Sequence, residues 1–299
     1  MSFSFDTKNE LCRLPVQRLC CARAEAYGIL LYCHTFGSNE IRIITGNENL
    51  ALRLPKLFRR AFDLQFDYRP EAEASGKRIF QIIQREKLDH IINLLGYAPR
   101  QNLALHINFA MVEEECCRAA FLRGCFFAGG SITDPFKSYH LELTSSHLQA
   151  SRELGVLLRE NGYPPKSVTR NGSFVTYFKQ SRQIEDFLTL IGAPVAAMQI
   201  MSAKLEKDLR NDVNRRLNCD SANLDKAVEA AQSQAEAIRK LQSAGRLMEL
   251  PNKLQETAAL RLEYPELSLS ELAEEFDPPV TKSCLNHRLR KLVELAGRL

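Results

Sequence analysis

"CCRAAFLRGCFFAGGSITDP", Cys116–Pro135, is the stretch that decides the fold of this chain of 299 residues. An apolar helical pattern fills its first part and runs directly into Gly129-Gly130-Ser131. A helix with this ending brings small residues and bare backbone close to whatever packs against it. We therefore expect the end of this helix to lie at a close contact between two elements.

The residues that follow predict an α+β unit. In chain order the patterns indicate a strand from Tyr139, a helix at 147–161, a hairpin at 167–179 and a helix at 182–191. Asn171-Gly172 favours a type I′ turn in the hairpin. The unit therefore has the order helix, strand, helix, hairpin, helix.

The same order recurs, less clearly, in the first hundred residues, with a helix at about 22–35, a strand from Ile41, a helix at 49–62, strands in "LQFDY" and "RIFQII", and a helix from Arg85. "CCARAEAYGILLYCHT" aligns without a gap on "CCRAAFLRGCFFAGGS" at an offset of 96 residues (116 − 20). Gly28 then lies over Gly124, and Cys20-Cys21 over Cys116-Cys117. The sequence thus predicts a tandem repeat, with residues 1–110 and 111–194 as its two copies.

Composition favours a folded cytoplasmic protein: 45% of the residues are hydrophobic, 25% are charged and the formal net charge is +4. The sequence contains no run of about 18 apolar residues, so we expect no membrane segment. It also lacks a secretory signal pattern, so we expect no export. The nine cysteines include two adjacent pairs and form no C-x-x-C motif. Because an adjacent pair alone is a poor zinc chelator, we interpret them as reduced structural thiols and expect no metal and no cofactor.

Residues 195–248 predict a helical connector, rich in Ala, Gln, Lys, Glu and Asn. Apolar residues recur every three or four positions from Met198 to Leu217, which indicates a long amphipathic helix. We expect a break at 218–220 and a second helix that ends before Gly245. Possible DNA contacts in this segment, by the chemistry of phosphate binding, are Arg210, Asn214, Arg215 and Arg216, together with Asn211 and Asn218. A solvated helix end with an Asn cap is the alternative.

Residues 249–299 predict three short helices. Asn252 is the expected cap of the first, Ser268 and Glu271 form a capping-box pair before the second, and Thr281 caps the third. "DPPV" forces a turn between the second and the third helix. This order is typical of a helix-turn-helix, although a small bundle with a solvated charged face would share it.

The third of these helices carries the chemistry of DNA recognition. Its expected buried stripe is Leu285, Leu289, Leu292, Ala296 and Leu299. The stretch 278–293 contains no acidic residue, whereas the preceding helix is acidic. We expect double-stranded DNA to contact Thr281, Lys282, Ser283, Asn286, His287, Arg288, Arg290 and Lys291. Asn286 is the expected base reader, since an amide pairs with adenine through two hydrogen bonds.

Over essentially its full length the chain resembles the WhiA family of bacterial DNA-binding proteins. The resemblance rests on "CCRAAFLRGCFFAGGSITDPFKSYHLEL", "LRNDVNRRLNCDSANLDKAVEAA" and "DPPVTKSCLNHRLRKL". It implies a degenerate LAGLIDADG homing-endonuclease-like tandem repeat, a helical connector and a C-terminal helix-turn-helix. It also implies a nucleoid-associated protein of Gram-positive bacteria with roles in transcription regulation, the cell cycle, cell division and chromosome segregation. Partners in the transcription or division machinery would be consistent with it.

The resemblance also bears on catalysis. LAGLIDADG enzymes pack two such helices side by side, and each helix ends in an acidic residue that binds the catalytic metal. By this resemblance Cys33 and Gly129 stand at the two acidic positions of this chain. Neither supplies the carboxylate oxygens that magnesium prefers. We therefore expect no catalytic residue, no metal and no enzyme activity, while a nuclease with displaced ligands, such as Asp134 and Glu142, and a protein-interaction scaffold stay open as alternatives.

Overall fold

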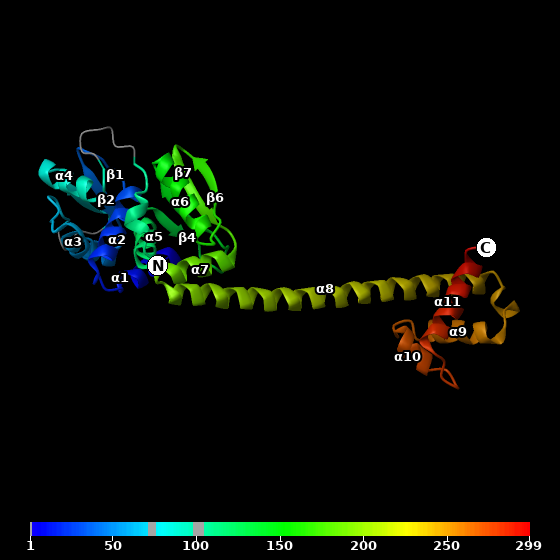
Figure 1. The fold of residues 1–299 in the computed structure, drawn as a ribbon. Helices are drawn as coiled ribbons and strands as arrows, with labels where there is room; N and C mark the ends of the chain where they lie inside the picture. Colours follow the sequence, from blue (N-terminus) through cyan, green and yellow to red (C-terminus); the bar gives the residue numbers. More distant parts are fainter. Residues whose placement is uncertain (1, 71–75, 98–104) are drawn as a thin grey trace. The chain divides into compact units, whose positions relative to one another are not determined.

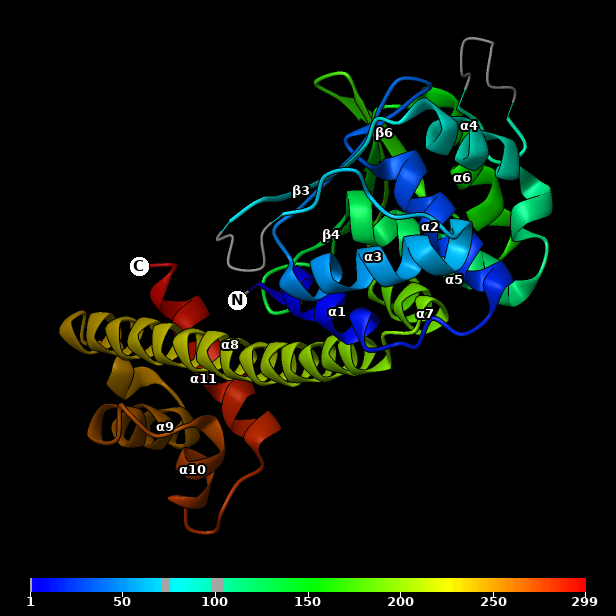
Figure 2. The ribbon, with the colours of Figure 1, turned by 90° about the vertical axis from the view of Figure 1, so that its left-hand side faces the viewer.

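The computed structural model describes residues 2–70, 76–97 and 105–299 (Figures 1 and 2). The chain divides into two compact units, Met1–Asp208 and Leu209–Leu299. Helix α8 (Pro194–Ser243) begins in the first unit and ends in the second.

The first unit contains two copies of one α+β arrangement. The first copy consists of α2 (Leu19–Tyr32), β1 (Thr35–Phe36), β2 (Ile41–Thr45), α3 (Glu48–Phe62), β3 (Arg78–Ile82) and α4 (Arg85–Leu94), preceded by α1 (Phe3–Cys12). The second consists of α5 (Glu115–Gly129), β4 (Gly130–Ile132), β5 (Leu141–Ser145), α6 (Leu148–Glu160), β6 (Lys166–Arg170), β7 (Ser173–Phe178) and α7 (Ser181–Ile191), preceded by the 3₁₀ turn η1 (Phe109–Val112). The tandem repeat and the α+β class are confirmed.

Both sheets are antiparallel. Their strand orders are β1-β2-β3 and β4-β5-β7-β6 among the described residues. Asn171 and Gly172 both have positive φ, 46° and 77°, as a type I′ turn requires. The hairpin β6–β7 therefore turns where its sequence predicts.

The expected strand "LQFDY", residues 64–68, is wrong. Only Tyr68 forms an isolated bridge, with Gln81. The carboxylate of Asp67 instead accepts hydrogen bonds from the amides of Ile83 and Gln84, at 2.8 and 2.9 Å, and pairs with Lys87. The amides of Asp67 and Tyr68 both donate to the Gln81 carbonyl, at 2.9 and 3.2 Å, so the segment pairs with β3 at one point and forms no regular ladder.

Helices α2 and α5 lie side by side in the core of the first unit (Figure 1). Both are buried on nearly all sides, which is why their apolar residues show no single hydrophobic face. The buried carboxylate of Glu25 on α2 pairs with Arg53 of α3 at 2.6 Å and with Arg123 of α5 at 2.8 Å. One charge thus connects elements of both repeats, and its two partners offset its desolvation.

The second unit is a three-helix module built on the end of α8. It contains α9 (Asn252–Glu263), α10 (Leu269–Glu274) and α11 (Lys282–Ala296), with the 3₁₀ turn η2 (Leu247–Glu249) before them. Ile238 and Leu241 of α8 lie in the same core as the apolar residues of α9, α10 and α11. The module therefore uses residues from the segment that the sequence assigns to the connector.

The capping predictions for this module are confirmed with one exception. Ser268 and Glu271 form the capping box of α10, and the Thr281 hydroxyl accepts a hydrogen bond from the Cys284 amide at 3.2 Å. Asn252, however, is the first residue of α9 and not its cap. The Pro251 carbonyl already accepts the first helical hydrogen bonds, so the helix begins one residue earlier than expected.

Two further expectations are wrong. The break at 218–220 does not form, because α8 continues through it to Ser243. Asn, Cys, Asp and Ser are only modest helix formers, but without Gly or Pro the segment costs a few tenths of a kcal/mol per residue, which does not end a helix. Leu299 is 49% exposed and lies outside the buried stripe, since α11 ends at Ala296.

Candidate nucleic-acid interface

The buried side of α11 fixes which of its residues face solvent. Leu285, Leu289 and Leu292 are fully buried, and Ala296 is nearly so. This stripe packs against α9 and α10. The opposite face of α11 is consequently held outward by the core of the module.

Arg261 of α9 holds the turn that precedes α10. Its side chain is almost fully buried, and its guanidinium donates to the carbonyl of Leu267 at 2.9 Å and to those of Tyr264 and Pro265 at 3.4 Å. Burial lowers the pKa of this guanidinium. Nothing in the sequence pattern marked this arginine as structural, because a lone basic residue near a helix end is usually solvated.

The exposed face of α11 carries nearly all of the predicted DNA contacts. Seven of the eight predicted residues are exposed, namely Thr281, Lys282, Ser283, Asn286, His287, Arg290 and Lys291. They combine cations for phosphates with short polar groups near the start of the helix. In this face the amide of Asn286 and the ammonium groups of Lys282 and Lys291 are open to a ligand.

Arg288 differs from its neighbours. It is half-buried, and its guanidinium packs over the ring of Phe276, 5.5 Å from the ring centroid. This cation–π contact ties α11 to the end of the preceding helix. Arg288 therefore lies apart from the exposed basic face.

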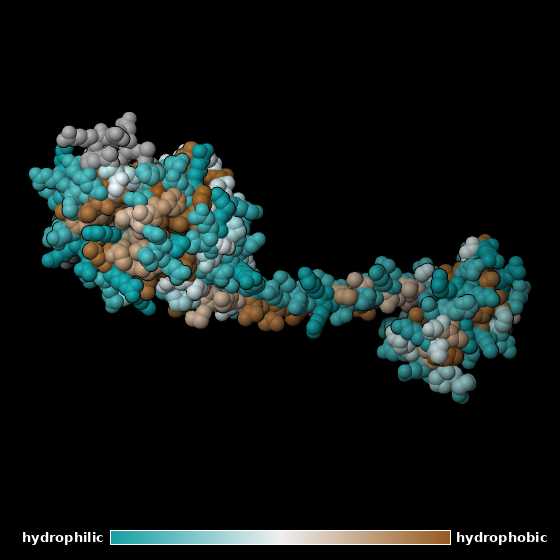
Figure 3. Space-filling model, viewed as in Figure 1, coloured by the Kyte–Doolittle hydropathy of each residue, from teal (hydrophilic) through white to brown (hydrophobic). Residues whose placement is uncertain are grey.

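The predicted contacts in the connector are exposed on α8. Arg210, Asn214, Arg215 and Arg216 all face solvent, as do Asn211 and Asn218. Exposed apolar residues share this helix, namely Leu209, Val213, Leu217, Leu224 and Val228 in the second unit and Val195, Met198, Met201 and Leu205 in the first. Figure 3 shows apolar side chains at the surface of α8.

The ends of α2 and α5 carry the positions where the resemblance to LAGLIDADG enzymes puts metal ligands. Cys33 caps the end of α2, is buried, and its thiol lies 3.2 Å from the Leu30 carbonyl and 3.1 Å from the Thr35 carbonyl. Burial raises the pKa of this thiol to about 12. At neutral pH Cys33 is therefore a neutral thiol that donates to these backbone carbonyls.

Gly129 ends α5 in contact with the neighbouring sheet. A Cβ at Gly129 would overlap the Thr144 carbonyl oxygen and lie 2.9 Å from a ring carbon of Tyr32. A side chain of any kind would displace the sheet, so a carboxylate does not fit at this position.

The two acids considered as substitutes have other roles. Asp134 accepts a hydrogen bond from the Phe136 amide at 2.9 Å, as a turn residue does. Glu142 lies on β5 and contacts Ser131 and His140, each at 3.2 Å. Among the described residues, neither acid belongs to a group of three or more His, Cys, Asp or Glu side chains with metal-ligand spacing.

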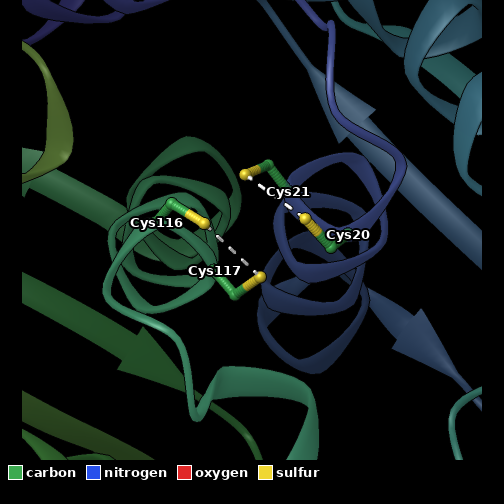
Figure 4. A group of neighbouring side chains, drawn as sticks. All are labelled: Cys20, Cys21, Cys116 and Cys117. Carbon is green, nitrogen blue, oxygen red and sulfur yellow. Dashed lines mark hydrogen bonds between the residues drawn. The ribbon is translucent and has the colours of Figure 1, made fainter.

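The structure brings both cysteine pairs together at the other ends of these helices (Figure 4). Cys20 and Cys21 lie in the first turn of α2, and Cys116 and Cys117 in the first turn of α5. We call these residues the four-cysteine group. The interpretation of the cysteines as separate structural thiols misses this group, because an adjacent pair alone is a poor zinc chelator. The gap-free alignment of the two helices carries the signal, since equivalent positions on paired, symmetry-related helices face each other.

The thiols of this group differ in their surroundings. Cys117 is buried, Cys21 and Cys116 are half-buried, and Cys20 is exposed. Burial raises the pKa of the Cys21 thiol to about 11 and also raises that of Cys117, whereas hydrogen bonding to Cys21 lowers the pKa of Cys116.

Two α+β repeats packed on a central pair of helices, followed by a three-helix module with an exposed basic helix, define a LAGLIDADG-like protein with a helix-turn-helix. Residues 118–210 match the family described as "WhiA LAGLIDADG-like domain", and residues 213–296 match "WhiA C-terminal HTH domain". The chain belongs to the WhiA family.

Relatives match along the whole chain. The "Probable cell division protein WhiA" of Ruminiclostridium cellulolyticum is 35% identical over 307 residues, covering 100% of this chain and 98% of the relative. The protein of the same name from Desulforudis audaxviator is 37% identical over 306 residues, with the same coverage. The crystal structure of full-length DUF199/WhiA from Thermotoga maritima has a TM-score of 0.61 and 23% identity, covers 100% of this chain and 99% of that one, and shares the fold.

No helix in the described part of the chain is both long and apolar enough to cross a membrane.

Proposed function

We propose that this chain is a sequence-specific binder of double-stranded DNA whose helix α11 enters the major groove. The observation that carries the proposal is the division of α11 into a buried leucine stripe and an exposed face that holds Asn286, Lys282 and Lys291. Phosphates attract the cations, and an amide reads adenine through its N6 and N7 atoms. Arg288, which packs on Phe276, contributes to the shape of the module.

Membership of the family supports a proposal for the cellular role. Relatives across the full length are named as cell division proteins. We propose that the chain acts on the nucleoid as a transcription regulator linked to cell division and chromosome segregation. Genome-wide mapping of bound sites tests this: the expected sites lie upstream of division and segregation genes and are lost in an Asn286→Ala, Lys291→Ala variant. Unchanged site selection by that variant would refute the role of α11.

We further propose that the LAGLIDADG-like unit of this chain does not cleave DNA. The support is local: Gly129 leaves no room for a carboxylate, and Cys33 is a buried neutral thiol. Incubation with plasmid or cognate DNA and magnesium or manganese tests the proposal. Cleavage that disappears in a Glu142→Ala variant would establish a nuclease with displaced ligands instead.

A second candidate function is protein binding by α8. The observation that favours it is the row of exposed apolar residues at spacings of three, four and seven, which includes Leu217, Leu224 and Val228. An amphipathic helix of this kind suits a partner with an apolar groove. Replacing Leu217, Leu224 and Val228 by Gln tests it: loss of a partner in a pull-down, with DNA affinity unchanged, would separate this function from DNA binding.

A further inference from the structure

The four-cysteine group has the geometry of a metal site. The sulfur atoms of Cys20 and Cys21 are 3.9 Å apart, those of Cys116 and Cys117 are 4.0 Å apart, and all four lie within 4.8 Å of one another. In a tetrahedral zinc site with Zn–S bonds of about 2.3 Å, the sulfurs are separated by about 3.8 Å. The observed sulfurs therefore need to approach by no more than about 1 Å to bind a zinc ion.

We propose that Cys20, Cys21, Cys116 and Cys117 bind one zinc ion, which joins the two repeats across the start of α2 and α5. Four thiolates in a tetrahedron are a ligand set of structural zinc, whereas magnesium and manganese prefer oxygen ligands. The site is distinct from the endonuclease position, because Cys33 and Gly129 lie at the opposite ends of the same helices.

The positions of the cysteines in their helices support this assignment. Each pair forms the second and third residues of its helix, within the first turn. The unpaired backbone N–H groups of this turn give the helix a positive end. Two such ends meet at this group. They stabilise the net negative charge that four thiolates keep after binding one divalent ion.

The surroundings allow an ion to enter and be retained. Cys20 is exposed while Cys117 is buried, so the group reaches from the surface into the core. Cys21 and Cys116 also line a surface cavity of about 260 Å³, together with Arg18 and Arg123. This cavity supplies an entry path, and its two arginines add positive charge near the thiolates.

The separations of the thiols favour a metal site over disulfides. A disulfide needs two sulfurs at about 2.05 Å, about half of the 3.9 and 4.0 Å that separate the adjacent sulfurs here. A metal ion uses all four at their observed separation. The group also joins residues 96 positions apart (116 − 20), so an ion that binds the group only in the folded chain would stabilise the packed repeats.

The test uses the full chain, produced without an affinity tag and handled under reduction. We expect elemental analysis to find about one zinc per chain, and cobalt(II) added to the chelated protein to give the strong visible bands and sulfur-to-metal charge transfer of a tetrahedral thiolate site. Zinc should raise the melting temperature of the chelated protein by about 5 °C or more. It should also protect these four thiols, mapped by mass spectrometry, from alkylation.

Two variants locate the site. Cys20→Ser with Cys21→Ser, or Cys116→Ser with Cys117→Ser, should abolish the cobalt spectrum and the zinc-dependent melting shift, while the matched control Cys219→Ser with Cys284→Ser, two exposed cysteines of the second unit, should keep both. The alkylation pattern of the parent chain decides the matter even if a variant fails to fold. The proposal is overturned if the reduced parent chain takes up neither zinc nor cobalt, if it holds iron instead, or if zinc leaves the alkylation of all four thiols unchanged.

Discussion

Gly28 and Gly124 face each other across the contact between α2 and α5 in a reciprocal manner. A Cβ on Gly28 would overlap the Phe121 carbonyl oxygen and lie 2.9 Å from the Cys125 amide nitrogen. A Cβ on Gly124 would overlap the Glu25 carbonyl oxygen and lie 2.9 Å from the Ile29 amide nitrogen. For each glycine, one contacted residue lies three positions before the opposite glycine and the other lies one position after it. A two-fold relationship between the helices requires this symmetry.

This relationship makes a stability prediction. We expect Gly124→Ala to lower the free energy of unfolding of the first unit by about 2–4 kcal/mol, because the added methyl group meets backbone that cannot move aside. Gly155→Ala on α6 is the matched control, since a Cβ there would meet only an Arg159 nitrogen at 3.7 Å. The control should be neutral or stabilising by up to about 1 kcal/mol. Denaturant unfolding followed by hydrogen exchange measures both, and equal effects would contradict the close packing.

Arg261→Met should destabilise the helix-turn-helix module by about 2–3 kcal/mol. It preserves much of the buried side-chain volume but leaves the carbonyls of Tyr264, Pro265 and Leu267 without their charged donor. Hydrogen exchange across residues 252–296 is the measurement. Arg298→Ala, which removes an exposed ion pair with Glu294, should change stability by less than about 1 kcal/mol. A module as stable as the parent after Arg261→Met would show that these bonds contribute little.

DNA affinity should separate base reading from phosphate binding on α11. We expect Asn286→Ala to weaken binding at the preferred site by about 1–3 kcal/mol and to affect random DNA little. Lys291→Ala should weaken both alike and reduce the salt slope by about one unit. Titrations at several salt concentrations measure both. If Asn286→Ala binds preferred and random DNA as the parent does, then readout depends on Arg290 or another exposed residue.

The basic cluster on α8 should contribute to binding without contributing to sequence choice. Arg215→Ala with Arg216→Ala is expected to lower affinity for all DNA and to reduce the salt slope by about two units. The control, Lys226→Ala with Arg239→Ala, removes the same charge from exposed positions farther along α8. Affinity and salt dependence that match this control would favour a solvated helix segment.

Alkaline pH should destabilise the first unit partly through Cys33. Burial raises the pKa of the folded thiol to about 12, whereas an unfolded thiol ionises near pH 8.5. The stability from keeping this thiol neutral is therefore complete below about pH 8.5 and is lost as the pH rises toward 12, by up to about 1.4 kcal/mol per pH unit. Cys33→Ser should make the fall with pH shallower, and Cys219→Ser controls for loss of a sulfur. Identical pH profiles for the parent and Cys33→Ser would contradict this account.

Several features of this protein are determined by the sequence alone. The gap-free match of Cys20–Thr35 with Cys116–Ser131 establishes the tandem repeat, and Asn171-Gly172 determines the hairpin turn. Ser268 with Glu271 and Thr281 mark where two helices begin. The repeat is visible in the sequence itself, and the turn and cap signals act between residues a few positions apart, so the chain carries all of them before it folds. The buried stripe of α11 is of the same kind, because helical periodicity alone places Leu285, Leu289 and Leu292 on one side.

Other features were decided only by the tertiary structure. Arg288 packs on Phe276 instead of facing solvent, Asp67 interrupts an expected strand, and Gly129 is closed off by Thr144 and Tyr32. The four-cysteine group is the clearest case, since neither pair can chelate zinc well alone and each becomes half of a site when α2 meets α5. These outcomes depend on distances between residues far apart in the chain. Such distances are set by how whole helices pack, which in this protein follows from two glycines that let the backbones of α2 and α5 touch.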